Sequence, residues 1–446
     1  MSGASTATQG LTPFQTHPGV LARWGLLGPL AVAAERNTRT LGLGAAVRVF
    51  NDLTVPGLGG VWFAKPLVLA ALGVDIARRR KRPNIEVANA VEALACRLEL
   101  EVRGWAGDAR LRGKTKLRGR DDLCYATVKR PSFYVTQPMR QQTVQPLMAL
   151  GLVDEGIARF NAFVLSERGQ QVIAAAFQGY RPYNKSVPDV LVEWVDGDRE
   201  RMETDTLRLA LSPINPLPEF CRDMLRDCLV QGSGAEAKRR RAAYDWINGF
   251  DGKSRDILTW SERPDPIDYS HWRDIRAGAR FFSARDAALR VLDRVEAFLA
   301  PSSRPSMALV GALPKSIAQA VSVLREKADA FLAEGHDPSP EWAAKRFCRE
   351  LQTSDDFRLI ATLVARDGRG LCLRGESIVP GSAFRGDRGE GDGEEGSVEE
   401  EGAETPGQRR IEWLEGISPR INNLFLLSLD LNGRLEKWIT PAPGPV

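Results

Sequence analysis

This sequence contains few residues that could hold a metal ion. Its six cysteines lie apart without a CxxC pair, and it has only three histidines, His17, His271 and His336. Structural zinc sites need closely spaced cysteine and histidine ligands, so we expect neither a metal site nor another cofactor. Scattered cysteines are typical of reduced thiols in a cytosolic protein. They are Cys96, Cys124, Cys221, Cys228, Cys348 and Cys372.

Long apolar runs are missing as well. The most apolar stretches, GLLGPLAVAA and PLVLAALGV, are about ten residues long, which is about half of the ~20 residues that a bilayer-spanning helix needs. The beginning of the chain is rich in serine and threonine and shows neither a basic region before an apolar core nor a small-residue cleavage pattern. We therefore expect a cytoplasmic protein without a membrane partner.

The sequence also lacks a strong catalytic signature. GDARLRGKTK is close to a phosphate-binding loop, but Asp108 stands where GxxxxGK[ST] requires glycine. DPIDYSHW spaces Asp265, Asp268 and His271 by three residues, yet carboxylates at a helix start are typical of caps. We expect no catalytic residues. A metal-dependent nuclease remains an alternative because EAK at 236–238 is similar to part of a nuclease motif.

Negative charge is concentrated in one stretch. Residues 387–404 hold nine acidic residues and one basic residue, Arg388, so the rest of the chain carries +12 although the total is +4. An excess of positive charge favours an anionic partner. The glycine and glutamate content of 386–408 cannot bury enough apolar area to offset the entropy of ordering, and predicts a disordered loop.

The periodicity of apolar residues predicts a mainly α fold with small β elements. Helices are predicted at 283–300, with a capping box at Ser283 and Asp286, and at 314–334, and these two should form an antiparallel pair. Short strands are predicted at 96–105 and around GLCLRGESIV. The expected divisions are 1–83 (apolar and Gly-rich), 84–180, 181–352 (helical) and 353–446 (mixed, containing the acidic loop).

One stretch points to a nucleic-acid contact. MRQQTVQPLMALGLV predicts a helix over 136–150 that stops at Gly151. Its apolar residues form an inward face, while Arg140, Gln141 and Gln145 project away. Arginine and glutamine can each make two hydrogen bonds to a base edge in the major groove. We therefore expect these three side chains to face DNA.

The residues after this helix predict a β-hairpin wing. Short strands are expected at 152–153 and 160–165, and Ser166 should cap the next helix. A helix, a wing and a second helix over 84–180 resemble winged helix-turn-helix domains of the MarR and ArsR kind, and the resemblance implies DNA contacts by Arg140, Gln141, Gln145 and Arg159. The matching residues are Leu147, Leu150, Gly151, Leu152, Val153, Arg159, Leu165, Ser166 and Gly169.

A basic stretch precedes the motif. Residues 103–130 include nine basic and three acidic residues, and the runs at 78–82 and 238–241 are basic too. If these charges share a face with the wing, phosphate contacts should make affinity steeply salt-dependent. The candidates within the stretch are Arg112, Lys114, Lys116 and Arg118.

The sequence thus predicts a non-catalytic prokaryotic protein that contacts double-stranded DNA through a winged helix. Its other regions would bind protein partners or form a homo-oligomer. The alternative is an adaptor of a multi-protein genome-maintenance or antiphage system, in which the winged helix contacts protein. A metal-dependent nuclease is the third class.

Overall fold

The computed structural model describes residues 39–154, 156, 158–249, 259–384 and 413–439. Helices dominate these residues, and the strands among them form one small three-stranded sheet. The expected mainly α fold with small β elements is confirmed. None of the described helices combines the length and apolarity needed to cross a bilayer. The acidic stretch 386–408 lies outside the described residues.

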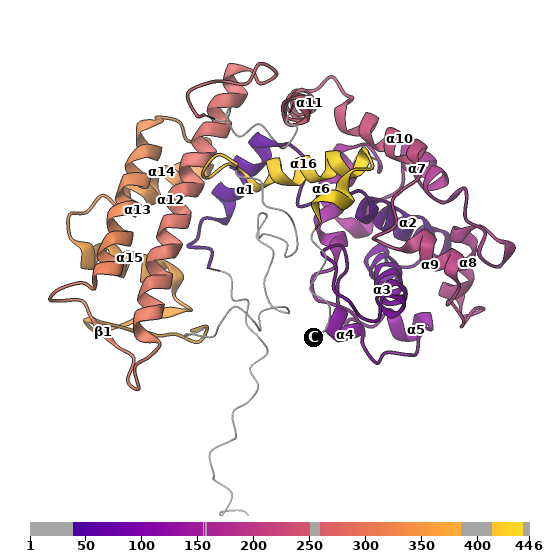
Figure 1. Ribbon diagram of the computed structural model, residues 1–446, viewed down its shortest axis with the longest axis horizontal. Coiled ribbons are helices and arrows are strands. Elements are labelled where there is room, and N and C mark those ends of the chain that lie inside the picture. The colour runs from indigo at the N-terminus through magenta and orange to yellow at the C-terminus, as the bar shows by residue number, and fades with distance from the viewer. Residues whose placement is uncertain (1–38, 155, 157, 250–258, 385–412, 440–446) are drawn as a thin grey trace, which may run out of the picture.

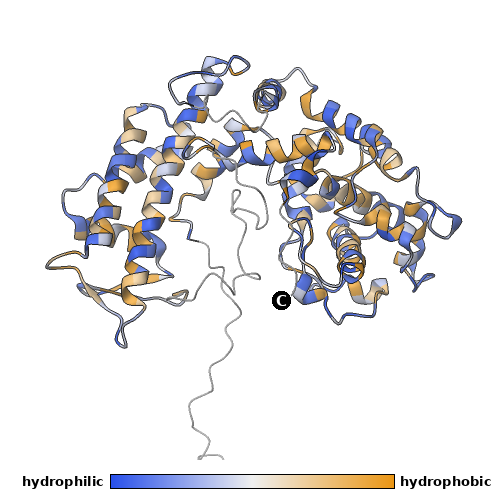
Figure 2. Ribbon diagram, viewed as in Figure 1, coloured by the Kyte–Doolittle hydropathy of each residue, from blue (hydrophilic) through white to orange (hydrophobic). Residues whose placement is uncertain are grey.

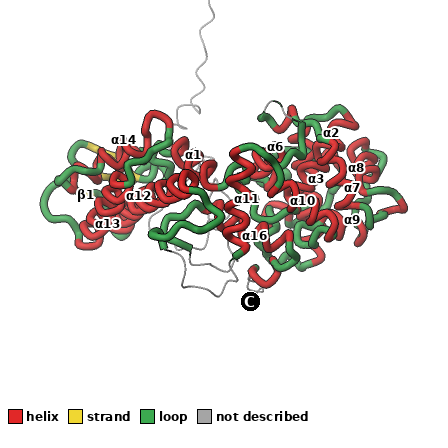
Figure 3. Tube along the Cα trace, turned by 90° about the horizontal axis from the view of Figure 1, so that it is seen from above, coloured by secondary structure: helices red, strands yellow, loops and turns green. Residues whose placement is uncertain are grey.

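Two lobes stand side by side and form an arch (Figure 1). Seen from above, the strands belong to only one of them (Figure 3). The α3 lobe, on the right of Figure 1, is built around its own hydrophobic core. Its elements are α2 (Lys65–Arg80), α3 (Asn84–Val102), α4 (Lys114–Leu117), α5 (Tyr125–Val128), η2 (Met139–Thr143), α6 (Val144–Ala149), η3 (Phe160–Ala162), α7 (Glu167–Phe177), η4 (Pro182–Asn184), α8 (Val187–Asp196), α9 (Asp205–Leu211), α10 (Glu219–Val230), α11 (Ala235–Asn248), α16 (Pro419–Leu431) and η6 (Leu435–Trp438).

The α12 lobe, on the left, has a second core. Its elements are α1 (Gly44–Thr54), α12 (Tyr269–Leu299), β1 (Met307–Ala308), α13 (Lys315–Ala333), η5 (Pro340–Trp342), α14 (Ala343–Glu350), α15 (Asp356–Asp367), β2 (Leu371–Arg374) and β3 (Ser377–Pro380). The sheet is antiparallel in the order β1-β3-β2, and the strand pair predicted around GLCLRGESIV is confirmed as β2 and β3. The sequence divisions at 83, 180 and 352 fall inside these two cores and not between them.

Helices α12 and α13 pack together as predicted, and apolar and polar residues alternate along both (Figure 2). Stacked and edge-on rings of Phe50, Phe281 and Phe331 fill the space between α1, α12 and α13. The predicted start of α12 at Ser283 is wrong, because the helix begins at Tyr269 and Ser283 is buried within it. The true cap is Asp268, whose carboxylate accepts the backbone N–H of His271 at 2.8 Å, as the cap interpretation of DPIDYSHW predicted.

The strand predicted at 96–105 is also wrong, because Cys96–Val102 continues helix α3. Its alternating polar residues do not mark a solvent-facing strand surface. Arg97 is buried and donates to Glu101 at 2.6 Å, and the buried Glu99 accepts from Arg208 at 2.9 Å. Burying a charged side chain is unfavourable unless it forms ion pairs or hydrogen bonds. The alternation of charged and apolar residues in this segment therefore reflects ion pairs that α3 makes within the lobe.

The predicted wing is reduced to one β-bridge between Val153 and Leu165. The second expected strand instead contains the short helical turn η3. The predicted helix over 136–150 is divided into η2 and α6. Two local predictions are nevertheless correct. Gly151 ends α6 with a positive φ of 65°, and the Ser166 hydroxyl caps α7 by accepting the backbone N–H of Gly169 at 3.0 Å.

A buried polar junction connects the lobes beneath the top of the arch. Arg420, only 1% exposed at the start of α16, donates to the Asp52 carboxylate at 2.6 Å and to the Val55 carbonyl at 3.0 Å. Ser418 donates to the Asn51 side chain at 2.7 Å. Because α1 belongs to the α12 lobe and α16 to the α3 lobe, these bonds hold the two lobes against each other.

Candidate nucleic-acid interface

Arg140 does not face solvent. It is 7% exposed, its Nε donates to the Asn89 side chain at 2.7 Å, and its guanidinium group lies 4.7 Å from the centre of the Phe160 ring. Burial lowers the pKa of this guanidinium group. A side chain held between α3 and η3 in this way cannot reach a base edge, so the outward orientation predicted for Arg140 is wrong.

The buried carboxylate of Glu92 explains why this segment lies against α3. Its oxygens accept the backbone N–H groups of Met139 at 2.7 Å and Arg140 at 3.0 Å, and the Tyr134 hydroxyl at 2.9 Å. Burial raises the pKa of Glu92, and the three hydrogen bonds oppose that effect. The first N–H groups of η2 thus point into the lobe. In a recognition helix, by contrast, the N-terminal residues contact base edges.

Gln141 and Gln145 have different surroundings. The Gln145 amide donates to Asp52 at 3.3 Å, and its oxygen accepts from Arg420 at 3.0 Å, so it belongs to the junction between the lobes. Gln141 is exposed and donates to the Thr136 carbonyl at 3.1 Å. The predicted reading face is therefore divided: Arg140 is buried, whereas Gln141 and Gln145 are both exposed and Gln145 is bonded to partners at the junction.

Arg159 is exposed at the loop before η3. The Asn84 side chain donates to the Phe160 and Phe163 carbonyls at 2.8 and 2.9 Å, which fixes this loop against the start of α3. Arg159 is exposed as predicted, but the residues that follow it form the helical turn η3 in this part of the described chain, where the prediction placed a strand of the wing.

The basic stretch before the motif is divided between interior and surface. Arg110 is buried and pairs with Asp108 at 2.9 Å and Glu436 at 2.6 Å. Arg112 is half-buried, and its charge partly opposes the rise that burial causes in the pKa of Glu92. By contrast, Lys114 and Arg118 are exposed and Lys116 is half-exposed, in and just after α4.

The fold brings further cations beside α4. Arg120 donates to the Ser132 carbonyl at 3.4 Å and lies over the Phe133 ring at 5.5 Å, so the segments around 118–120 and 130–132 are neighbours. Lys129 pairs with Glu86 of α3 at 3.7 Å. The resulting surface follows one side of α3, and we call it the basic band. It comprises Arg82, Lys114, Lys116, Arg118, Arg120, Lys129 and Arg130.

Four carboxylates lie in or beside the basic band, against its seven cations, and one of them, Glu101, pairs with Arg97. Glu86 bonds Lys129 and the Tyr125 hydroxyl, and Asp121 pairs with Arg97 at 3.5 Å. Hydrogen bonds from Thr127 and Cys124 lower the pKa of Asp122 to about 2. Positive charge therefore remains in excess on this surface. Figure 1 shows α4 and α5 at the lower end of the lobe, next to α3.

No metal centre accompanies the basic band within the described residues, where no group of three or more histidine, cysteine or carboxylate side chains comes together. Trp246 of α11 and Trp272 of α12 pack edge-on with ring centres 6.1 Å apart and are buried, so these rings anchor the two helices to each other. Comparison of the chain with protein-family models, curated proteins and solved structures gives no match.

Proposed function

We propose that this protein is a non-catalytic binder of duplex DNA that contacts the phosphate backbone through the basic band. The observation that carries the proposal is the gathering of exposed cations from α2–α3, α4 and the segment after α5 along one side of a single helix. Phosphate contacts by lysine and arginine supply most of the affinity in sequence-independent DNA binding.

The dimensions of the basic band suit a duplex. The surface extends along α3 from Arg82 to the neighbourhood of Arg97, where the Arg97 Nε donates to the Arg120 carbonyl at 3.0 Å. At 1.5 Å per helical residue this is roughly 20 Å. Duplex DNA carries one negative charge per about 1.7 Å of its axis, so the band can meet several phosphates at once.

The same geometry favours binding without base reading. Direct readout needs arginine, lysine, asparagine or glutamine side chains that reach base edges in a groove. Arg140 and Gln145 are held by protein partners instead. We therefore expect similar affinity for duplexes of unrelated sequence.

Charge reversal tests the proposal. The triple variant K114E/K116E/R118E should weaken the binding of a fluorescein-labelled duplex by about a hundredfold or more in an anisotropy titration at low salt, because three attractive phosphate contacts become repulsive. The matched control R290E/R294E/K315E reverses the charge of three cations exposed on the α12 lobe and should bind nearly as wild type. Equal losses in both variants would show that net charge, and not the basic band, determines affinity.

An adaptor is the second candidate, and one observation favours it. The segment expected to read DNA is built into the junction between the lobes, through the contacts of Gln145 with Asp52 and Arg420. The fold also exposes Trp342 at 69% and Phe220 at 67%, and large aromatic side chains are common anchors in protein interfaces. A partner retained on the immobilised protein at 1 M salt, and no longer retained with Trp342→Ala, would support this function over DNA binding.

A further inference from the structure

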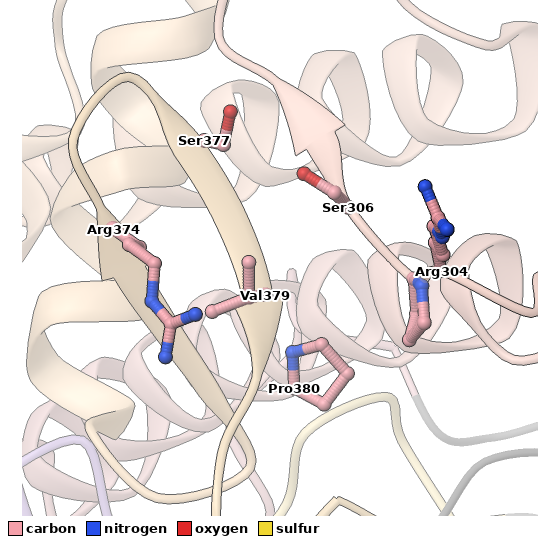
Figure 4. A pocket seen from close by; sticks show the side chains of 7 residues that line it. Arg304, Ser306, Arg374, Ser377, Val379 and Pro380 are labelled. Atoms are coloured by element: carbon pink, nitrogen blue, oxygen red, sulfur yellow. The ribbon is translucent and has the colours of Figure 1, made fainter.

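A cleft of about 490 Å³ lies on the α12 lobe, away from the basic band. Its walls come from the segment that leads into β1 and from the β2–β3 hairpin (Figure 4). Ligand sites for small molecules commonly have volumes of about 300–1,000 Å³, so the cleft is large enough for more than a single inorganic ion. The lining residues are Arg304, Pro305, Ser306, Arg374, Ser377, Val379 and Pro380.

The lining combines positive charge, hydroxyl donors and apolar surface. Arg304 and Arg374 stand on opposite sides of Val379 in Figure 4. No carboxylate is among the residues that line the cleft, and no ion pair between described residues involves either guanidinium group. Ser306 and Ser377 add two hydroxyl groups, and Val379 lies between the two arginines. Such a lining favours an anion attached to an apolar or aromatic group.

The sheet holds Arg374, Ser377 and Val379 on β2 and β3, and Arg304 and Ser306 lie on the segment that leads into β1. Ser377 of the central strand β3 is paired with Arg374 of β2 on one side and with Ala308 of β1 on the other. Arginine's planar guanidinium group can donate two parallel hydrogen bonds to a phosphate. Two such groups from different segments can neutralise both charges of a phosphomonoester dianion.

We propose that this cleft binds the phosphomonoester group of a nucleotide, with the sugar or base packed against Val379 and the neighbouring prolines. Two sources supply this chemistry: a free mononucleotide, and the 5′-phosphorylated end of a nucleic-acid strand. Neither source requires the basic band, because the cleft belongs to the other lobe.

Calorimetric titration of the full chain with AMP, and with adenosine as the comparison, tests the site. AMP should bind at least tenfold more tightly than adenosine. Arg304→Ala and Arg374→Ala should each weaken AMP binding about tenfold, because each removes a charge-assisted hydrogen-bonding group. Arg374→Lys keeps the positive charge but cannot donate two parallel hydrogen bonds, and it should give an intermediate loss of AMP affinity. Arg369→Ala, an exposed arginine close by that does not line the cleft, is the matched control and should bind AMP as wild type does.

A second arm distinguishes the two sources. If the strand end is bound, a 5′-phosphorylated single-stranded oligonucleotide should bind more tightly than its 5′-hydroxyl counterpart, and Arg374→Ala should remove that preference. If only free nucleotides fit, AMP binds and the two oligonucleotides do not differ. Equal affinity for AMP and adenosine, or unchanged AMP affinity in both alanine variants with unchanged circular dichroism, would overturn the proposal. The basic-band variant K114E/K116E/R118E should still bind AMP, which separates this result from the duplex titration.

Discussion

The interiors of the two lobes differ in chemistry. The core of the α12 lobe is filled mainly by aliphatic and phenylalanine side chains, among them the stacked rings of Phe50 and Phe281 at 5.2 Å, and this lobe buries fewer charged side chains than the α3 lobe, Glu296 and Asp274 among them. The interior of the α3 lobe also holds ionisable side chains, each with partners: Glu92 accepts three hydrogen bonds, and Arg240 donates to the Ala149 carbonyl at 3.1 Å. Cationic side chains therefore have two roles in the α3 lobe. Those in the interior pair with buried acceptors, and those at the surface form the basic band.

This difference predicts which substitutions destabilise each lobe. Apolar truncation should dominate in the α12 lobe, and loss of a polar partner should dominate in the α3 lobe. Burying a polar group without its partner costs free energy comparable to that of a moderate cavity. Four measurements test the comparison, in decreasing order of expected effect.

Phe281→Ala should lower the free energy of unfolding by about 3–5 kcal/mol, because it removes a fully buried ring and leaves a cavity. Urea unfolding followed by circular dichroism measures the change. Phe298→Ala on the same helix is the control, since that ring is 47% exposed, and its loss should be much smaller. Similar effects of both substitutions would contradict the assignment of Phe281 to the core.

Glu92→Ala should lower the free energy of unfolding by about 3 kcal/mol, because two backbone N–H groups and the Tyr134 hydroxyl lose their acceptor. Glu92→Gln keeps one acceptor oxygen and should cost less. The same urea titration measures both variants. If the alanine variant were as stable as wild type, Glu92 would not hold η2 against α3.

The pH dependence of stability should include a contribution from His271, which is buried near the start of α12. Its Nε2 lies 2.9 Å from the Thr54 carbonyl, and burial lowers the pKa of the imidazole below its ordinary value of 6.5. The folded state therefore binds this proton less readily than the unfolded chain does. The stability contributed by neutral His271 should be present above pH 6.5 and be lost as pH falls through the lowered pKa.

The variant His271→Gln should reduce the slope of unfolding free energy against pH between 6.5 and 5, measured by urea titration at each pH. The imidazole of His271 is fully buried, and this burial is the cause of the expected pH dependence. His336→Gln is the comparison, because His336 is less buried and bonds Asp274 at 2.6 Å. An unchanged slope in His271→Gln would show that this imidazole does not titrate differently in the folded state.

The smallest expected effect concerns the cap of α7. Ser166→Ala should lower the free energy of unfolding by about 1 kcal/mol, because the Gly169 N–H loses its acceptor. Ser166→Asp should retain most of the stability, since aspartate caps a helix start equally well. Thermal unfolding measures both, and equal losses in the two variants would contradict the capping role.

The same difference in interior chemistry explains which sequence predictions succeed. Helix α13 and the β2–β3 pair follow their apolar patterns, because the side chains that these elements bury are apolar. Arg97, Glu99 and Arg140 instead look like surface residues in the sequence but are buried with partners. Glu99 and Arg140 have partners on other segments, which spacing alone cannot identify. The partner of Arg97 is Glu101, four residues along α3, and the strand interpretation of 96–105 hid that pair.

For the candidate site, the sequence shows that residues 103–130 are rich in positive charge, but it does not show which of these side chains lie at the surface. The sequence could not separate the buried Arg110 from the exposed Arg118, since that depends on Glu436 reaching the first of them from the end of the chain. Pro146 was a signal against a regular recognition helix, because proline removes a helical hydrogen bond. The segment is divided into η2 and α6 two residues before it.

The salt dependence of duplex binding tests the central claim most directly. Each phosphate that the protein neutralises contributes about 0.9 to the magnitude of the slope of log affinity against log salt. Replacing Lys114, Lys116 and Arg118 by glutamine should therefore reduce the magnitude of the slope by about 2.7 relative to wild type. A slope unchanged by this triple substitution would contradict DNA binding through the basic band.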